Sequence, residues 1–141
     1  MDNVIASLLE RVASGDMKAI REYAYKLYKG EEVEKDVKEA YRLFAQAAEH
    51  DDTNAMFWLG AICENEKECL SLQEGFEWFL KAAKLGDIAA QFQIGYHYLH
   101  GVTVQQDYYQ AFKWFIISAM HGYPNSQNSL GTMYLRCGTA N

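Results

Sequence analysis

The sequence predicts an all-α fold in which pairs of antiparallel helices stack side by side as a solenoid. Small residues recur every 35 or 36 positions, in the series Ala19, Ala55, Ala90 and Ser126. Between them, apolar residues follow the three- and four-residue spacing of helices and not the alternation of strands. The 141 residues include one proline, which argues against an all-β protein built from many turns. A repeat of this length is typical of arrays of helix pairs.

Further features keep the same period and register. A second small residue follows five positions later, at Ala24, Gly60, Gly95 and Gly131. An apolar pair comes later in each unit, at Leu43-Phe44, Trp78-Phe79 and Trp114-Phe115. Each unit closes at a turn, at Gly15, Asp51, Gly86 and Gly122. Because small residues let a neighbouring helix approach closely, we expect the aromatic rings to pack beside them, and the units to be stabilised by stacking.

The units define the helices in order. The first segment, 1–15, carries the apolar stripe of one helix and is expected to be an N-terminal cap. Three helix pairs follow in 16–51, 52–86 and 87–122. The last segment, 123–141, provides one helix of a partial fourth unit, a C-terminal cap. The whole chain, 1–141, is therefore predicted to be a single domain of about eight helices.

Side chains at the predicted helix starts are suited to accept backbone hydrogen bonds. The first helix of each pair follows an N-cap aspartate, at Asp16, Asp52 and Asp87. The second helices begin at capping boxes, Asp36 with Glu39, Ser71 with Glu74 and Asp107 with Gln110. Pro124 takes the first position of the last helix, which we expect to stop near Gly138.

The third unit carries the fullest version of the pattern: Ala90, Ile94-Gly95, Tyr98, Gly101, Val104, Asp107, Ala111, Trp114-Phe115, Ala119 and Gly122. This pattern resembles the Sel-one-like repeat (SLR) family, which is related to the tetratricopeptide repeat (TPR) superfamily. The resemblance covers residues 16–136 and implies a right-handed α/α solenoid of Sel-like, TPR-like helix pairs. It departs at Glu32 and Thr103, where the family usually has a second loop glycine, and in the shorter loop of the second unit.

Composition excludes several functional classes. The net charge of −6 argues against a nucleic-acid binder, which needs a basic surface. The chain as given has no signal peptide or long apolar run, so we expect no membrane span and a cytoplasmic location. Three cysteines fit a reducing compartment. Residues 73–141 hold 13 of the 20 aromatic residues but only four basic and four acidic ones.

No motif for catalysis, a cofactor or a metal emerges, and we predict that the protein is not an enzyme. His97 and His100 are three apart on one helix and could share a metal, but no His-Glu-x-x-His or paired Cys-x-x-Cys motif accompanies them. Cys63 and Cys69 flank the loop of the second unit, where a disulfide and two free thiols both stay open. No phosphate-binding glycine loop occurs.

Surface recognition remains. In TPR-like arrays the first helix of each unit lines the concave face, and the resemblance transfers this geometry to positions three before, and one, four and five after, the small residue. These are Arg21, Tyr25, Tyr28, Lys29, Phe57, Ala61, Glu64, Asn65, Phe92, Tyr96, Leu99, His100, Asn128, Thr132, Leu135 and Arg136, with Lys18 and Asn54 one turn earlier. The candidates for partner binding are Lys18, Arg21, Tyr25, Tyr28, Asn54, Phe57, Phe92, Tyr96, His100 and Asn128.

This face is rich in aromatic residues, with a basic end at Lys18, Arg21 and Lys29. Aromatic side chains with a polar tip are common anchors of protein interfaces. The alternative is that several of these rings pack between first helices as core, above all Phe57. We expect the three tyrosines of the candidate set to be exposed. Phe92, Tyr96, Tyr108 and Tyr109 exceed what the repeat needs.

These observations predict a scaffold or adaptor that binds a peptide or a protein domain, as a monomer or an end-to-end dimer. The family resemblance offers two alternatives. One is a bacterial immunity protein that neutralises a secreted toxin, with the acidic segments Glu31–Asp36 and Glu64–Glu68 as an edge contact. The other is a weak β-lactam hydrolase, as suggested for cysteine-rich relatives, but no Ser-x-x-Lys motif occurs.

Overall fold

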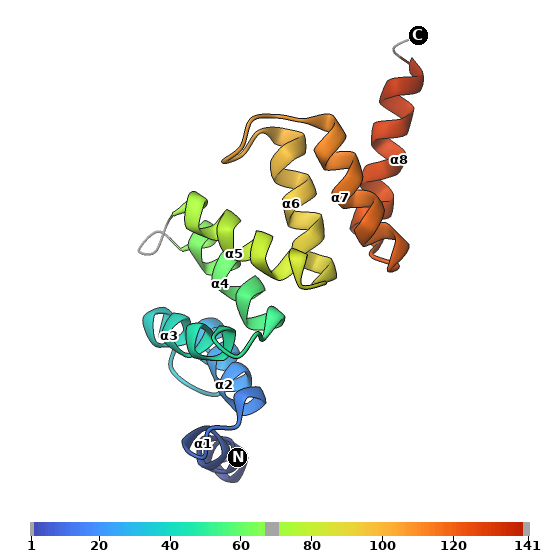
Figure 1. Ribbon diagram of the computed structural model, residues 1–141. Coiled ribbons are helices and arrows are strands. Elements are labelled where there is room, and N and C mark those ends of the chain that lie inside the picture. The colour runs from blue at the N-terminus through green and yellow to red at the C-terminus, as the bar shows by residue number, and fades with distance from the viewer. Residues whose placement is uncertain (1, 67–70, 140–141) are drawn as a thin grey trace.

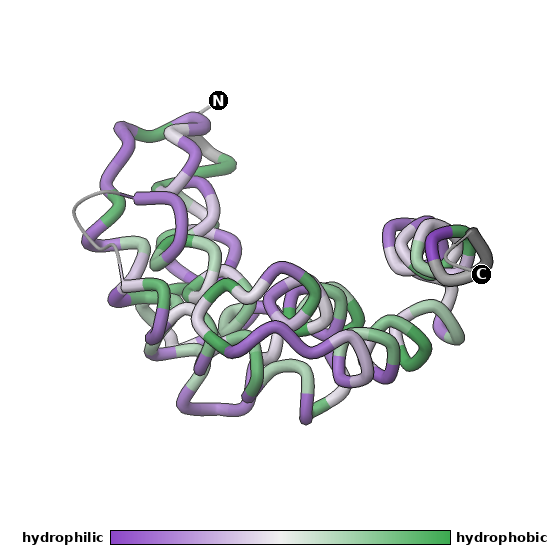
Figure 2. Tube along the Cα trace, turned by 90° about the horizontal axis from the view of Figure 1, so that it is seen from above, coloured by the Kyte–Doolittle hydropathy of each residue, from purple (hydrophilic) through white to green (hydrophobic). Residues whose placement is uncertain are grey.

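A computed structural model describes residues 2–66 and 71–139, which form eight helices and no strand. The helices are α1 (Asp2–Ala13), α2 (Met17–Lys29), α3 (Val37–Ala48), α4 (Thr53–Asn65), α5 (Leu72–Lys84), α6 (Ile88–His100), α7 (Tyr108–Met120) and α8 (Pro124–Thr139). Each packs on its neighbours in sequence (Figure 1), and the chain traces an arc when seen from above (Figure 2). The predicted all-α solenoid is confirmed. Helix α8 ends one residue beyond Gly138, near which a stop was expected.

The first helices start at the predicted N-caps. The Asp16 carboxylate accepts hydrogen bonds from the N–H groups of Lys18 and Ala19, at 3.1 and 3.3 Å. The equivalent aspartates cap α4 and α6 in the same way. Each carboxylate satisfies backbone donors that a helix start leaves open, which fixes where the helix begins.

The second helices are capped differently from the prediction. The side chains of Asp36, Ser71 and Asp107 do accept a hydrogen bond from the N–H three residues on. The reciprocal half of the capping box is absent from these three starts. Each cap N–H donates instead to a carbonyl of the preceding first helix, in the pairs Asp36–Leu27, Ser71–Cys63 and Asp107–Tyr98, at 2.9–3.1 Å. This backbone bond ties the start of the second helix to the end of the first in every repeat.

The core is built from aromatic rings set against small residues. Phe79 and Phe115 are buried, and each ring lies where a Cβ on Gly60 or Gly95 would stand, within 2.8 and 2.6 Å respectively. At the fourth small residue, Gly131, no described atom beyond the neighbouring backbone of its own helix lies within 4 Å of that position. The tryptophans that precede the rings, Trp78 and Trp114, are half-buried and pack on the rim of the core.

Three turns hold residues with side chains in a left-handed conformation. Asp51 has φ of 61°, whereas Gly15, Gly86 and Gly122 occupy the equivalent turns at φ of 84–102°. Glu32 and Thr103 have φ of 64° and 68°, where the resembled family has glycine. The backbone path of the repeat is therefore kept at these positions at the cost of local strain.

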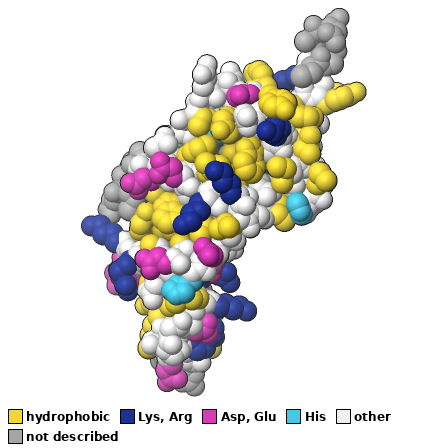
Figure 3. All heavy atoms as spheres, viewed as in Figure 1, with side chains coloured by type: hydrophobic (Ala, Val, Ile, Leu, Met, Phe, Trp, Pro, Cys, Tyr) yellow, Lys and Arg dark blue, Asp and Glu magenta, His cyan; other side chains and the backbone are white. Residues whose placement is uncertain are grey.

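Charge and apolar surface separate along the array. In the face shown in Figure 3, hydrophobic side chains gather toward the α6–α8 end, and acidic side chains lie mostly toward the N-terminal half. The exposed large hydrophobic residues include Tyr108, Tyr109, Met120, Tyr134 and Leu135. The aromatic excess of the second half is thus partly a surface feature.

The ring-on-glycine contact predicts opposite effects for one substitution at two equivalent positions. Gly95→Ala should lower the free energy of unfolding by about 1 kcal/mol or more, since overpacking costs about 1–3 kcal/mol and helix propensity returns only about 1. Gly131→Ala should raise it by up to about 1 kcal/mol, because that Cβ meets open space. Urea unfolding of both variants measures the difference. Equal shifts of the same sign would refute the contact.

The strained turn predicts a stabilising change. Asp51→Gly should raise the free energy of unfolding by about 0.5 kcal/mol, because glycine adopts φ of 61° without the cost that a side chain brings. Asp51→Ala is the matched control, which removes the carboxylate and keeps the strain, and it should destabilise. Thermal unfolding compares them, and a glycine variant no more stable than the alanine variant would contradict the account.

Candidate partner-binding face

The first helices α2, α4, α6 and α8 form one surface, called here the first-helix face, and it carries two hollows. The N-terminal hollow, of about 320 Å³, is lined by Lys18, Arg21, Glu22, Tyr25, Asn54 and Trp58. The C-terminal groove, of about 460 Å³, is lined by Leu99, His100, Tyr108, Asn128, Ser129, Thr132, Met133 and Arg136. A further depression lies on the outer side of α3, among mostly charged and polar side chains such as Lys38, Arg42 and Glu49.

The N-terminal hollow has an aromatic floor between α2 and α4. The rings of Tyr25 and Trp58 meet edge to face, with centroids 5.1 Å apart. The Lys29 ammonium lies 5.8 Å from the centroid of the Trp58 ring, in a cation–π arrangement. Arg21 places Nη1 3.2 Å from both carboxylate oxygens of Asp52. These contacts hold the side chains in place, so the floor is set before any partner binds.

The predicted basic end of the face is therefore only partly available. Arg21 is half-buried against Asp52, and Lys29 covers aromatic rings. Lys18 is exposed, and no described residue pairs with its ammonium. Glu22 brings a negative charge to the same hollow. An acidic group of a partner could pair with Lys18 directly. Arg21 and Lys29 would contribute less, because both already have partners within the protein.

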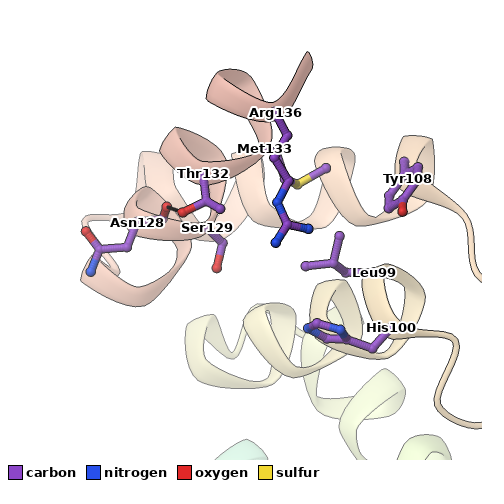
Figure 4. A pocket seen from close by; sticks show the side chains of 8 residues that line it. All are labelled: Leu99, His100, Tyr108, Asn128, Ser129, Thr132, Met133 and Arg136. Carbon is purple, nitrogen blue, oxygen red and sulfur yellow. Dashed lines mark hydrogen bonds between the residues drawn. The ribbon is translucent and has the colours of Figure 1, made fainter. Parts of the chain in front are cut away.

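The C-terminal groove lies between α6 and α8, with Tyr108 at the start of α7 on its rim (Figure 4). Leu99 and Met133 point into the space between these helices. Polar groups from α8 line one wall, and His100 lies on the opposite side. Beside the groove, Tyr96 packs on His100 with ring centroids 4.3 Å apart. The groove thus combines an apolar interior with hydrogen-bonding walls, as binding sites commonly do.

The structure brings six of the ten predicted residues into the two hollows. Lys18, Arg21, Tyr25 and Asn54 line the first, and His100 and Asn128 line the second. Tyr96, 44% exposed, lies beside the groove as expected of an exposed residue. Phe57 and Phe92 are half-buried and pack on the rings of Phe79 and Phe115, at 5.4 and 5.6 Å.

The expectation that Tyr28 is exposed is wrong. Its side chain is 9% exposed and packs against Trp58, with ring centroids 6.0 Å apart. Burial raises the pKa of the Tyr28 hydroxyl above its ordinary value. Tyr25, expected to be exposed, is half-buried against the same tryptophan. The large ring on the next first helix covers both tyrosines, which the register alone does not reveal.

Sequence reasoning missed one register position of the face. Glu22, Trp58 and Ser129 stand two residues before the small residue, and all three line a hollow. This position lies three residues before the one at Tyr25 and Thr132, so it belongs to the same helical stripe. The spacing was a usable signal. The other tryptophans, Trp78 and Trp114, belong to second helices, so Trp58 has no counterpart at this position of the other first helices.

The two histidines of α6 do not converge. His97 is buried, with Nε2 2.5 Å from Glu64 Oε1 on α4 and Nδ1 3.0 Å from Thr103 Oγ1. His100 is exposed and stacks on Tyr96 instead. Among residues 2–66 and 71–139, no three His, Cys, Asp or Glu side chains gather as metal ligands. His97 and Glu64 thus form a polar clamp between the first helices of successive repeats.

Several carboxylates of the acidic edge segments are engaged within the protein. Glu64 belongs to the clamp, Glu32 pairs with Lys26 at 2.6 Å, and Glu66 lies 3.9 Å from Lys35. The Glu32 contact raises the pKa of Lys26. Glu68 and Cys69 lie outside the described residues, so the structure does not address the Cys63–Cys69 alternative. These pairings leave fewer carboxylates for a contact at this edge.

The repeat pattern and the helix pairs agree with a match to a known repeat family. A family model of the Sel1 repeat matches residues 18–52, 53–87 and 88–123. The chain belongs to the Sel1 repeat family. Sel1 repeat proteins generally mediate protein–protein interaction and are typically not enzymes. In the part of the chain that the structure describes, no helix combines the length and apolar character needed to cross a bilayer.

Similar proteins come from several organisms. The chain is 35% identical, over 89 residues, to the chitin synthase regulator SKT5 of Saccharomyces cerevisiae, a match that covers 59% of this chain and 12% of the regulator. The structure of c5321, a protective antigen of uropathogenic Escherichia coli, superposes with a TM-score of 0.84 at 30% identity, over 92% of this chain and 28% of that one. A Sel1 repeat protein of Oxalobacter formigenes gives 0.83 at 29% identity, over 90% and 52%.

A cysteine-rich relative shares the fold only. Helicobacter pylori cysteine rich protein B superposes with a TM-score of 0.67 at 23% identity, over 82% of this chain and 95% of that one. The chain spans about an eighth of the yeast regulator, and 28% and 52% of the two bacterial structures above. The matched proteins are longer than this chain, so their functions as whole proteins do not transfer to it directly.

Proposed function

We propose that this Sel1 repeat chain is a non-enzymatic scaffold that holds a segment of another protein on its first-helix face. One observation carries the proposal: equivalent register positions of successive first helices line both hollows. The position one after the small residue supplies Tyr25 in the first hollow and Thr132 in the second. The hollows therefore belong to one repeating surface along the array, suited to a partner segment that runs across several repeats.

The chemistry of this face suits protein recognition. Protein interfaces gain most of their affinity from a few buried aromatic and arginine side chains, with polar groups at the rim. The face presents the Tyr25–Trp58 floor and the exposed rings of Tyr96 and Tyr108, beside the amides of Asn54 and Asn128. These groups stand on helices held by the repeat core, so binding a partner costs little conformational entropy to order them.

The charges of the face favour a mixed partner segment over a strongly acidic one. Asp52 already neutralises Arg21, and Glu22 stands in the same hollow as Lys18. A partner with one acidic group near Lys18 and apolar side chains along the rest would match this pattern. Such a segment also suits the C-terminal groove, whose lining holds no carboxylate.

Blocking the face with added arginine side chains tests the proposal without touching the core. Asn54→Arg with Asn128→Arg places one new side chain in each hollow, at exposed helix positions. We expect affinity capture from the native cell to lose the specifically bound protein at least tenfold, because both anchor sites are filled. Quantitative mass spectrometry of the captured proteins measures the loss.

A matched control carries the same two charge changes off the face. Gln73→Arg on α5 and Gln105→Arg in the loop before α7 also replace exposed amides. This variant should capture the partner as the parent chain does. The proposal fails if both double variants lose the partner alike, if neither does, or if the parent chain captures no protein that the face variant loses.

A further inference from the structure

The three aspartates that cap the first helices differ in the cations beside them. Arg11 Nε lies 3.4 Å from the Asp16 carboxylate, and Arg21 Nη1 lies 3.2 Å from both carboxylate oxygens of Asp52. Asp87 caps α6 through Oδ2 in the same way as the other two. In the part of the chain that the structure describes, however, no basic side chain pairs with its carboxylate, and Oδ1 accepts no hydrogen bond from another residue.

The repeat register shows which cation is missing. The ion pair of Arg21 with its aspartate joins two register positions at the junction of α2 and α4. At the junction of α6 and α8 the same two positions hold Phe92 and Tyr123, whose ring centroids are 5.5 Å apart. At the middle junction, between α4 and α6, they hold Phe57 and Asp87. The middle junction therefore keeps the carboxylate of the ion pair and has an aromatic ring in place of the arginine.

Phe57 cannot supply what the arginine supplies at the first junction. Its half-buried ring packs on Phe79 and Trp58, with centroids 5.4 and 5.5 Å apart, and it carries no hydrogen-bond donor. Asp87 is half-buried as well, and this burial raises the pKa of its carboxyl above the ordinary value, against the opposing effect of the cap bond. The carboxylate is thus held partly out of water with no compensating charge.

The middle junction lies on the path of a segment that runs along the first-helix face. The N-terminal hollow is formed by α2 and α4, and the C-terminal groove mainly by α6 and α8. A segment that reaches from one to the other crosses from α4 to α6. Arg21, at the register position of Phe57, lines the first hollow, so this position faces the same path.

We propose that the α4–α6 junction binds an arginine side chain of the partner segment, whose guanidinium pairs with the Asp87 carboxylate beside the Phe57 ring. The inference rests on the proposed function, because the segment held on the first-helix face brings the arginine. It adds one basic residue to that segment, between the acidic group near Lys18 and the apolar part in the C-terminal groove.

The ion pair at the first junction is the template for this contact. It shows that a carboxylate which caps a first helix can accept a guanidinium at the same time. A planar guanidinium also stacks on an aromatic face while it donates to a carboxylate, which a compact ammonium group does less well. The chemistry of the site therefore favours arginine over lysine.

The probe is a pentapeptide with blocked ends that carries arginine between two alanines on each side. Titrated into the full chain, it should shift the NMR signal of the Asp87 carboxyl carbon in a saturable way. Asp87→Asn should weaken binding, followed through the amide signals of α4 and α6, by about threefold or more, the effect of one exposed ion pair. Asparagine still caps the helix, so the fold is kept. The same pentapeptide with lysine or citrulline at its centre should bind more weakly.

A matched control separates this pair from general attraction between a basic peptide and a chain of net charge −6. Asp107→Asn makes the same change at the exposed N-cap of α7, away from the junction. It should bind the pentapeptide as the parent chain does. Circular dichroism should show the same helix content in both variants.

Four results would overturn the proposal. They are no saturable binding at tens of millimolar peptide, equal binding by the parent chain and Asp87→Asn, equal weakening by Asp87→Asn and Asp107→Asn, and equal binding of the arginine peptide and either of its analogues. The capture experiment on the first-helix face is a separate readout. If the face variant loses its partner while Asp87→Asn binds the pentapeptide normally, the arginine site fails and the scaffold function stands.

Discussion

The packing of a phenylalanine ring against a glycine of the first helix, seen in the second and third repeats, is the contact on which the rest of the structure depends. It sets how closely the two helices of a repeat approach, because no side chain lies between the ring and the backbone. The repeated bond from the second-helix cap to a first-helix carbonyl then fixes how far one helix slides along the other. With spacing and slide both fixed, each repeat presents the same positions of its first helix to the same face.

The features predicted correctly from the sequence are those that depend on local chemistry or on the period. The aspartate N-caps act within one turn of helix, so each is visible in a single unit, and the ring positions are visible from their fixed spacing across the units. The exposure of the tyrosines is not, since it depends on which side chain the next repeat places opposite. Tyr28 is covered by Trp58, whereas its equivalent in the third repeat, Leu99, lines an open groove.

The capping boxes show the same difference between features set by local sequence and features set by tertiary contacts. The sequence pattern matched the motif, and the side-chain half of each box forms. The other half is lost because the cap N–H has a better placed acceptor on the first helix, a tertiary partner that a four-residue motif does not contain. Glu39, freed from the box, pairs with Arg42 instead, which lowers the pKa of the Glu39 carboxyl. Local motifs thus predict helix starts more reliably than the partners of every group.

Departures from the repeat gather around the proposed recognition surface. Trp58 gives the N-terminal hollow its floor, the His97–Glu64 clamp joins the first helices of the second and third repeats, and Phe57 stands where the first repeat has Arg21. The repeat supplies a rigid frame, and these departures distinguish this array from others with the same frame. The resulting account places recognition on the helices, in side chains held before a partner arrives.

Hydrogen–deuterium exchange of the chain, alone and saturated with the protein it captures, tests this account most directly. Binding on the first-helix face predicts slower exchange in peptides from α2, α4, α6 and α8, with α3 and α5 unchanged. Slower exchange confined to α3, α5 or the acidic segment Glu31–Asp36 would contradict it, because the partner would then bind the outer side or the edge of the array.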